Sequence, residues 1–304
     1  MELGRDSARV IQYSESSTLR VPLVLDPWLR DLMVDPISKK PFVTVDSDGF
    51  LAPCGFRYTY RDGVPDFRVQ LGAGAKMWAQ GQKTFAQWFM RYLDRGEASN
   101  SFYPAEQQRD RRVYEAITLE GRVLDVGGQL GHIRKYMAPH QQYCSIDPFV
   151  GVHLLASNRK NLFANYPLTL PLNFLGGFAE FLPIRDESFD TVNMRSCIDH
   201  FFNPEIALME AFRVTRKRGK LIVGLKIEGH TLKSSLLDIA KGVVGTFVSR
   251  YKDHHMWHPS YAGLIALCRG CGFDLEKEYW QTSDVLYASF IRRDTHLVTV
   301  ETDN

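Results

Sequence analysis

A glycine-rich turn in the middle of the chain has the composition of a ligand-binding loop. Residues 123–131 read Val-Leu-Asp-Val-Gly-Gly-Gln-Leu-Gly, an apolar run that ends in glycines. Such a run predicts a buried parallel strand and a tight loop, followed by a helix over residues 132–138. Glycines in the loop let backbone N–H groups approach a ligand, because no Cβ is in the way.

The glycine spacing distinguishes two kinds of cofactor. A dinucleotide fold requires G-x-G-x-x-G, and in that frame Val126 stands at the first glycine position. The pattern D-x-G-x-x-x-G is instead met by Asp125, Gly127 and Gly131. Asp147 ends the next expected strand, about 20 residues past the loop, where an acidic side chain contacts ribose hydroxyls in nucleotide-binding βαβ units. The spacing therefore favours the D-x-G-x-x-x-G pattern over the dinucleotide-binding pattern.

Further motifs follow in order along the chain. Residues 177–183 read Gly-Phe-Ala-Glu-Phe-Leu-Pro, residues 189–192 read Phe-Asp-Thr-Val, and residues 213–220 form a basic segment with Gly219. Together with the loop, they resemble the class I S-adenosylmethionine-dependent methyltransferases, especially the small-molecule branch, over roughly Val113–Arg293. The resemblance implies an α/β fold with a Rossmann-like seven-stranded sheet, helices on both faces, and S-adenosylmethionine as the cofactor.

The resemblance also implies a cofactor site at the loop and at the ends of the next strands. Two of its residues depart from the family pattern, because Gln129 replaces a loop glycine and Phe178 replaces the acid that usually holds the adenine amino group. An aromatic ring at position 178 could stack on the adenine instead. These departures leave a non-catalytic S-adenosylmethionine-binding scaffold as an alternative. The expected cofactor-binding residues are Asp125, Gly127, Gly128, Gln129, Gly131, Asp147, Phe178, Ala179 and Arg195.

Two other segments carry the expected catalytic residues. Asp199 and His200 follow the fourth expected strand, at the edge where open α/β sheets bind ligands. His255 occupies the place of a histidine that small-molecule relatives carry. These residues are expected to contact the acceptor or take up its proton, and simple packing is the alternative for the histidines. We expect no metal ion at the three histidines of residues 254–258, because a facial metal site usually adds a carboxylate and methyl transfer requires no metal.

The chain divides into three expected parts. Residues 1–19 are polar and predict a flexible arm. Residues 20–70 predict a β-rich module with a hairpin, and they resemble a degenerate zinc-ribbon-like (Trm112-like) domain. Only Cys54 remains of the cysteine pairs that hold metal in that family, so we expect a metal-free relic that braces the catalytic domain or covers one side of the cleft. Residues 71–304 form the expected methyltransferase domain.

Two segments of that domain are expected to shape the substrate pocket. Residues 77–94 predict an amphipathic helix rich in aromatic side chains, which either packs on its domain or covers the site as a lid. Residues 228–259 predict a helical insertion, with a helix over residues 231–250. Capping of the cleft is the favoured role for this insertion, and a dimer face or a lipid contact are the alternatives.

Composition limits the partners. The net charge is only +2 over 304 residues, which argues against a nucleic-acid substrate. A small molecule, of natural-product or glycan type and methylated on O or N, is the first expectation, and RNA is the runner-up. We expect no membrane span, because the longest apolar stretch is too short. Five cysteines at irregular spacing favour free thiols and a cytoplasmic location, and a homodimer remains open.

Overall fold

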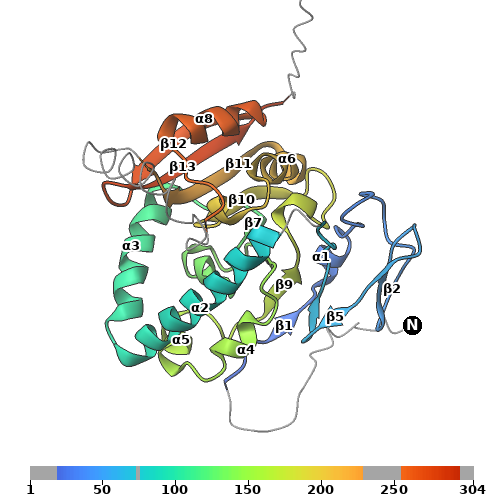
Figure 1. The fold of residues 1–304 in the computed structure, drawn as a ribbon, viewed down its shortest axis with the longest axis horizontal. Helices are drawn as coiled ribbons and strands as arrows, with labels where there is room; N and C mark the ends of the chain where they lie inside the picture. Colours follow the sequence, from blue (N-terminus) through green and yellow to red (C-terminus); the bar gives the residue numbers. More distant parts are fainter. Residues whose placement is uncertain (1–18, 73–75, 229–254, 295–304) are drawn as a thin grey trace, which may run out of the picture.

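A mostly parallel sheet forms the centre of the molecule. The computed structural model describes residues 19–72, 76–228 and 255–294. Helices lie on both faces of the sheet (Figure 1), so the expected Rossmann-like fold is confirmed. The strands run in the order β1-β9-β8-β7-β10-β11-β13-β12, with bounds β1(Leu23–Val24), β7(Val123–Val126), β8(Tyr143–Asp147), β9(Leu172–Gly176), β10(Phe189–Arg195), β11(Thr215–Lys226), β12(Phe273–Trp280) and β13(Val285–Arg292).

The sheet has eight strands and not the expected seven. The additional strand is β1, in which Leu23 pairs in parallel with Leu172 of β9. Two residues carry no usable periodicity, so this strand could not be found from sequence. It joins the N-terminal segment directly to the sheet edge.

The strand order reverses between β7 and β10, which are parallel neighbours. Open α/β sheets bind ligands at the carboxyl ends of strands on either side of such a reversal. The helices around the sheet are α2(Lys76–Ala98), α3(Phe102–Ala116), α4(Val152–Ala156), α5(Lys160–Asn165), α6(Pro204–Val214) and α8(Tyr261–Gly270). The expected aromatic helix is confirmed as α2, which lies across the sheet in front of β7 and β9 in Figure 1.

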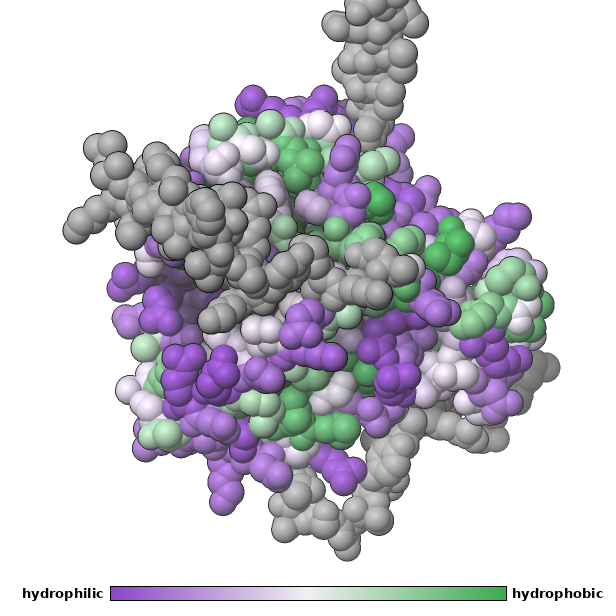
Figure 2. All heavy atoms as spheres, in the orientation of Figure 1, coloured by the Kyte–Doolittle hydropathy of each residue, from purple (hydrophilic) through white to green (hydrophobic). Residues whose placement is uncertain are grey.

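The N-terminal module contains the expected hairpin. Strand β2(Thr44–Asp46) pairs with β3(Gly49–Leu51), and β4(Arg57–Tyr58) completes a three-stranded sheet; α1(Pro27–Arg30), β5(Tyr60–Arg61) and β6(Val64–Pro65) make up the rest. Phe50 and Phe67 are fully buried, and their ring centroids are 4.9 Å apart. Both belong to the same hydrophobic core as the central sheet. Apolar side chains also appear among polar ones on the surface of the module (Figure 2).

One local expectation is wrong. The segment after the glycine loop is a short 3₁₀ helix, His132–Tyr136, because Pro139 follows and disfavours continuation of an α-helix. The basic segment begins with Arg213 in the last turn of α6, and its remaining residues lie in β11, which begins at Thr215.

Two expected features lie outside the described residues. The structure does not describe residues 229–254, which contain the helix expected over residues 231–250, most of the insertion at 228–259, and His254. Within the described residues, no helix combines the length and the apolar character that a membrane span requires.

Candidate active site

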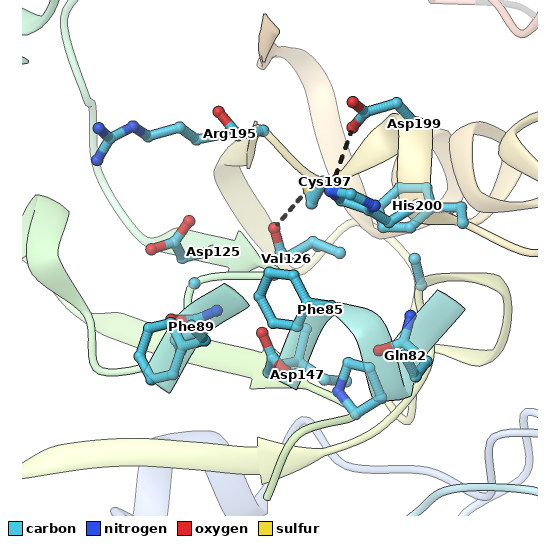
Figure 3. A pocket seen from close by; sticks show the side chains of 18 of the residues that line it. Gln82, Phe85, Phe89, Asp125, Val126, Asp147, Arg195, Cys197, Asp199 and His200 are labelled. Atoms are coloured by element: carbon cyan, nitrogen blue, oxygen red, sulfur yellow. Dashed lines mark hydrogen bonds and ion pairs between the residues drawn. The ribbon is translucent and has the colours of Figure 1, made fainter. Parts of the chain in front are cut away.

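A cavity of about 550 Å³ lies at the carboxyl ends of β7, β8 and β10. Figure 3 shows Asp125 and Asp147 on one side of it and Asp199 and His200 on the other, with Phe85 of α2 between them. The lining contains every expected site residue except Gly131. The expected residues that line it are Asp125, Gly127, Gly128, Gln129, Asp147, Phe178, Ala179, Arg195, Asp199, His200 and His255.

Asp125 supports the loop from beneath. Its Oδ2 accepts a hydrogen bond from the Tyr143 hydroxyl at 2.6 Å, and its Oδ1 accepts one from Asn193 Nδ2 at 2.7 Å. Burial raises the pKa of Asp125 to about 6, although these two hydrogen bonds oppose the shift. Both carboxylate oxygens are therefore engaged by protein groups, and Asp125 holds β7, β8 and β10 together at the floor of the cavity.

The loop backbone leaves no room for a side chain at Gly127 or Gly128. A Cβ on Gly127 would lie 2.6 Å from Cys197 Cβ, and one on Gly128 would lie 2.4 Å from Asp125 Cγ. Gln129 adopts a positive φ of 45°, a conformation that non-glycine residues seldom adopt. Its carbonyl accepts a hydrogen bond from Ser145 Oγ at 2.9 Å, which helps to fix this turn.

Gly131 is the expected site residue that does not line the cavity. It adopts a left-handed φ of 71° and begins the 3₁₀ turn. A Cβ there would lie 2.8 Å from Arg134 Nε and 3.0 Å from the Tyr143 ring. Gly131 therefore shapes the loop from outside the cavity.

Asp147 stands at the carboxyl end of β8 and is only 5% exposed. Burial raises its pKa to about 7, opposed by a hydrogen bond that Oδ1 accepts from the Phe149 amide at 2.7 Å. The carboxylate lines the cavity. This is the position from which an acidic side chain contacts ribose hydroxyls in nucleotide-binding βαβ folds.

A second polar wall contains residues that the sequence did not identify. Glu106 of α3, His132 and Tyr166 line the cavity beside Arg195. Arg195 Nη2 donates to Asp110 Oδ1 at 2.8 Å, and its Nε donates to the Tyr287 hydroxyl at 3.0 Å.

His132 and Tyr166 form a stacked pair on this wall. Their ring centroids are 4.0 Å apart. Burial lowers the pKa of His132 to about 3, so the ring is neutral. Its buried Nε2 has no hydrogen-bond partner in the described part of the chain. The position of His132 directly after Gly131 is the only sequence signal that could have indicated it.

Phe178 and α2 form an aromatic wall. The rings of Phe178 and Trp78 meet edge to face with centroids 5.1 Å apart. Phe85, Trp88 and further aromatic residues of α2 also line the cavity. The helix therefore covers one side of the site, and it also packs on its domain, since Phe89 and Leu93 are buried in the hydrophobic core.

Asp199, His200 and His255 form a polar cluster opposite Asp147. Asp199 Oδ2 lies 3.5 Å from His255 Nε2, and Asp199 Oδ1 lies 4.0 Å from His200 Nε2. The two imidazole rings stack with centroids 4.6 Å apart. The fold thus brings together all three residues expected to act on the acceptor.

Known proteins match the middle of the chain. Residues 124–223 match the family described as a methyltransferase domain. YcgJ of Bacillus subtilis, named an uncharacterized methyltransferase, is 31% identical over 132 residues, which are 39% of this chain and 51% of YcgJ. The chain therefore spans about half the length of this curated relative. The matches support the expected enzyme class, an S-adenosylmethionine-dependent methyltransferase, and its cofactor.

Two solved structures resemble part of this chain. The crystal structure of YcgJ covers 62% of this chain and 100% of its own, with 16% identity and a TM-score of 0.47. A methyltransferase from Thermotoga maritima covers 71% of this chain and 100% of its own, with 19% identity and a TM-score of 0.47. At these scores the likenesses do not define an acceptor or a partner.

Proposed function

We propose that this protein transfers the methyl group of S-adenosylmethionine to an O or N atom of a small molecule. One observation supports this most: a single cavity combines the glycine loop and Asp147 on one side with Asp199, His200 and His255 on the other. The first set suits an adenosyl cofactor, and the second offers polar groups to an acceptor. The reactive methyl group would lie between them.

The cofactor would lie along the strand ends. Asp147 would accept hydrogen bonds from the ribose hydroxyls, and the loop backbone at Gly127 to Gln129 would face the amino-acid end. Arg195 would bind the carboxylate of that end. Phe178 and Ala179 would contact the adenine, with Trp78 supporting the Phe178 ring from its edge.

The methyl acceptor would lie beside Asp199, His200 and His255, which we propose as the catalytic residues. The sulfonium makes the methyl carbon electrophilic, so the acceptor atom attacks it in line with the departing sulfur. Holding the three atoms in line is worth up to about 7–11 kcal/mol. The cluster would orient the acceptor and stabilise its charge once a hydroxyl proton has left.

The cavity favours a small acceptor over RNA. A volume of about 550 Å³ lies in the range of small-molecule sites and is closed on one side by α2. The basic segment is also largely neutralised, because Arg216 pairs with Asp190 at 2.6 Å and Lys220 pairs with Glu120 at 2.6 Å. An unpaired basic surface is what RNA binding requires.

The N-terminal module would brace the catalytic domain. Lys39 Nζ pairs with Glu210 of α6 at 2.5 Å, and the Val34 amide donates to the Pro183 carbonyl at 3.0 Å. Glu210 is 8% exposed. These contacts fix α6 against the loop that carries Phe178 and Ala179, so the module supports the cofactor site from behind. We propose the degenerate zinc-ribbon-like ancestry of this module on the sequence resemblance alone.

Calorimetric titration with S-adenosylmethionine and S-adenosylhomocysteine tests the proposal. Both should bind with one-to-one stoichiometry, and radiolabelled S-adenosylmethionine should then transfer its methyl to members of a panel of small hydroxyl and amine compounds. Absence of binding by both cofactor forms would overturn the proposal. Binding with transfer only to RNA would reject the small-molecule acceptor.

A further inference from the structure

Three side chains with metal-ligating atoms converge at the acceptor side of the cavity. Asp199, His200 and His255 each offer one ligand atom, and these atoms all lie within 4.8 Å of one another. We propose that they bind a divalent transition-metal ion. The site rests on its own geometry, whereas the role given to the ion below rests on the proposed methyl transfer.

The donor set suits such an ion. Two imidazoles and one carboxylate bind zinc or iron in many enzymes and leave positions open for a substrate. Metal–ligand bonds of about 2.0–2.2 Å place neighbouring ligand atoms about 3–3.5 Å apart. The Asp199–His255 separation of 3.5 Å already meets that spacing, and the Asp199–His200 separation of 4.0 Å exceeds it slightly. Small side-chain rotations would close the three residues around one ion.

The buried carboxylate of Asp199 gives independent support. Asp199 is 9% exposed, and its buried Oδ1 has no hydrogen-bond partner among the residues that the structure describes. A buried polar atom left unpaired costs about 1–3 kcal/mol. A simple Asp–His pair would use only Oδ2, whereas a bound cation also compensates the second oxygen. By contrast, the neighbouring His258 makes an ordinary pair, with Nδ1 2.7 Å from Glu228 Oε1.

Backbone contacts hold the cluster together. The amides of Met256 and Trp257 both donate to the Asp199 carbonyl, at 2.7 and 3.2 Å. Trp78 Nε1 of α2 donates to the His200 carbonyl at 3.0 Å. Three segments distant in sequence are thereby fixed around the three side chains.

The inference revises the expectation drawn from sequence. No metal was expected at the histidines of residues 254–258, because a facial metal site usually adds a carboxylate and methyl transfer requires no metal. The fold supplies the carboxylate from residue 199, which is 56 positions earlier in the chain. The second imidazole comes from His200, so only one of the ligands belongs to the segment that suggested a metal.

The ion would select a hydroxyl acceptor. A hydroxyl oxygen bound at an open position loses its proton more readily, because the cation stabilises the resulting anion. That proton passes to water. An oxygen lone pair then forms the new O–C bond, and the electron pair of the breaking C–S bond stays on sulfur, which leaves neutral S-adenosylhomocysteine. The acceptor class is therefore an alcohol or phenol, whereas an already neutral amine needs no such activation.

Zinc and cobalt titrations of the full chain test the site. Protein stripped with a chelator should bind one Zn²⁺ per chain, and Co²⁺ at the same site should give a visible absorption band that Zn²⁺ abolishes. Asp199→Asn and His255→Gln should each weaken Zn²⁺ binding about 100-fold or more, because each removes one of three protein ligands. His258→Gln is the matched control and should bind Zn²⁺ as the wild type does.

Unchanged Zn²⁺ affinity in both ligand variants, or no saturable binding by the wild type, would overturn the metal site. Far-ultraviolet circular dichroism shows that each variant remains folded. Titration of every variant with S-adenosylhomocysteine separates the two proposals. Cofactor binding without Zn²⁺ binding would reject only the metal site. Zn²⁺ binding without binding of either cofactor form would support the metal site and reject the proposed function.

Discussion

The two sides of the cavity are built in different ways. On the cofactor side, Asp125 and Asp147 lie on adjacent parallel strands, and both oxygens of Asp125 accept hydrogen bonds from protein groups. On the proposed acceptor side, Asp199 and His200 lie in the 3₁₀ helix Ile198–His200 and His255 lies outside any helix or strand, and a buried oxygen of Asp199 has no hydrogen-bond partner in the described part of the chain. The carboxylate of Asp125 is thus fully hydrogen-bonded within the fold, whereas that of Asp199 is not.

The hydrogen bonding of the two buried carboxylates indicates that Asp125 stabilises the fold, whereas Asp199 is available to bind a ligand. A buried carboxylate with all its hydrogen bonds made contributes to stability, whereas one with an unpaired oxygen costs free energy until something binds. Substitutions on the two sides should therefore have opposite consequences for stability and for ligand binding.

The largest effect is expected on the free energy of unfolding when Asp125 is replaced. Asp125→Ala leaves the buried Tyr143 hydroxyl and Asn193 amide without their acceptor, which should cost about 2–4 kcal/mol of unfolding free energy. Urea unfolding measures this. The control is Asp274→Ala, which removes an exposed carboxylate paired with Arg293 at 3.4 Å and should change stability by about 0.5 kcal/mol or less. Equal losses in the two variants would contradict the supporting role of Asp125.

Asp147→Ala should weaken binding of the cofactor. Loss of hydrogen bonds between ribose hydroxyls and a carboxylate is worth about 1.5–3 kcal/mol, so the affinity for S-adenosylhomocysteine should fall about 10–100-fold. Calorimetry measures the change, and His255→Gln on the opposite side should keep its affinity within about twofold of the wild type. An unchanged affinity in Asp147→Ala would remove the main support for the cofactor side.

The pH dependence of cofactor binding should follow Asp147. Burial raises its pKa to about 7, so lowering the pH through 7 protonates the carboxylate and removes a hydrogen-bond acceptor for ribose. Affinity for S-adenosylhomocysteine should therefore be highest above about pH 7 and fall by at most tenfold per pH unit below it. Titrations between about pH 8 and about pH 6 measure the slope. The same slope in Asp147→Asn would assign it to another group.

The smallest effect is expected at Asp199 in metal-free protein. Removing a carboxylate with an unpaired buried oxygen should change the unfolding free energy by about 1 kcal/mol or less, and a slight gain is the expected direction. Urea unfolding of Asp199→Ala beside Asp125→Ala gives the comparison. A loss as large as that of Asp125→Ala would show that the acceptor side supports the fold after all.

Sequence reasoning succeeded where the signal is local. The loop at Gly127 and Gly128, the acid at Asp147 and the helix that became α2 follow from short-range patterns that parallel strands and helices impose. It failed for β1, whose two residues gain their structure only by pairing with β9. It also missed Glu106 and Tyr166, because their place in the cavity depends on how α3 and the segment after α5 pack on the sheet.

The proposed acceptor side also depends on a long-range contact that the sequence does not reveal. Asp199, His200 and His255 were each identified singly, but their convergence depends on the hydrogen bonds that the amides of Met256 and Trp257 make to the Asp199 carbonyl. No spacing in the sequence encodes that contact. The expectation of a metal-free site was drawn from the histidine segment and from the reaction class, before the fold placed Asp199 beside His255.

A crystal structure with S-adenosylhomocysteine bound tests the central claim most directly. The account predicts ribose hydroxyls within hydrogen-bond distance of the Asp147 carboxylate and the sulfur atom facing Asp199, His200 and His255 across the cavity. A ligand bound elsewhere, or a sulfur atom turned away from these three residues, would contradict it.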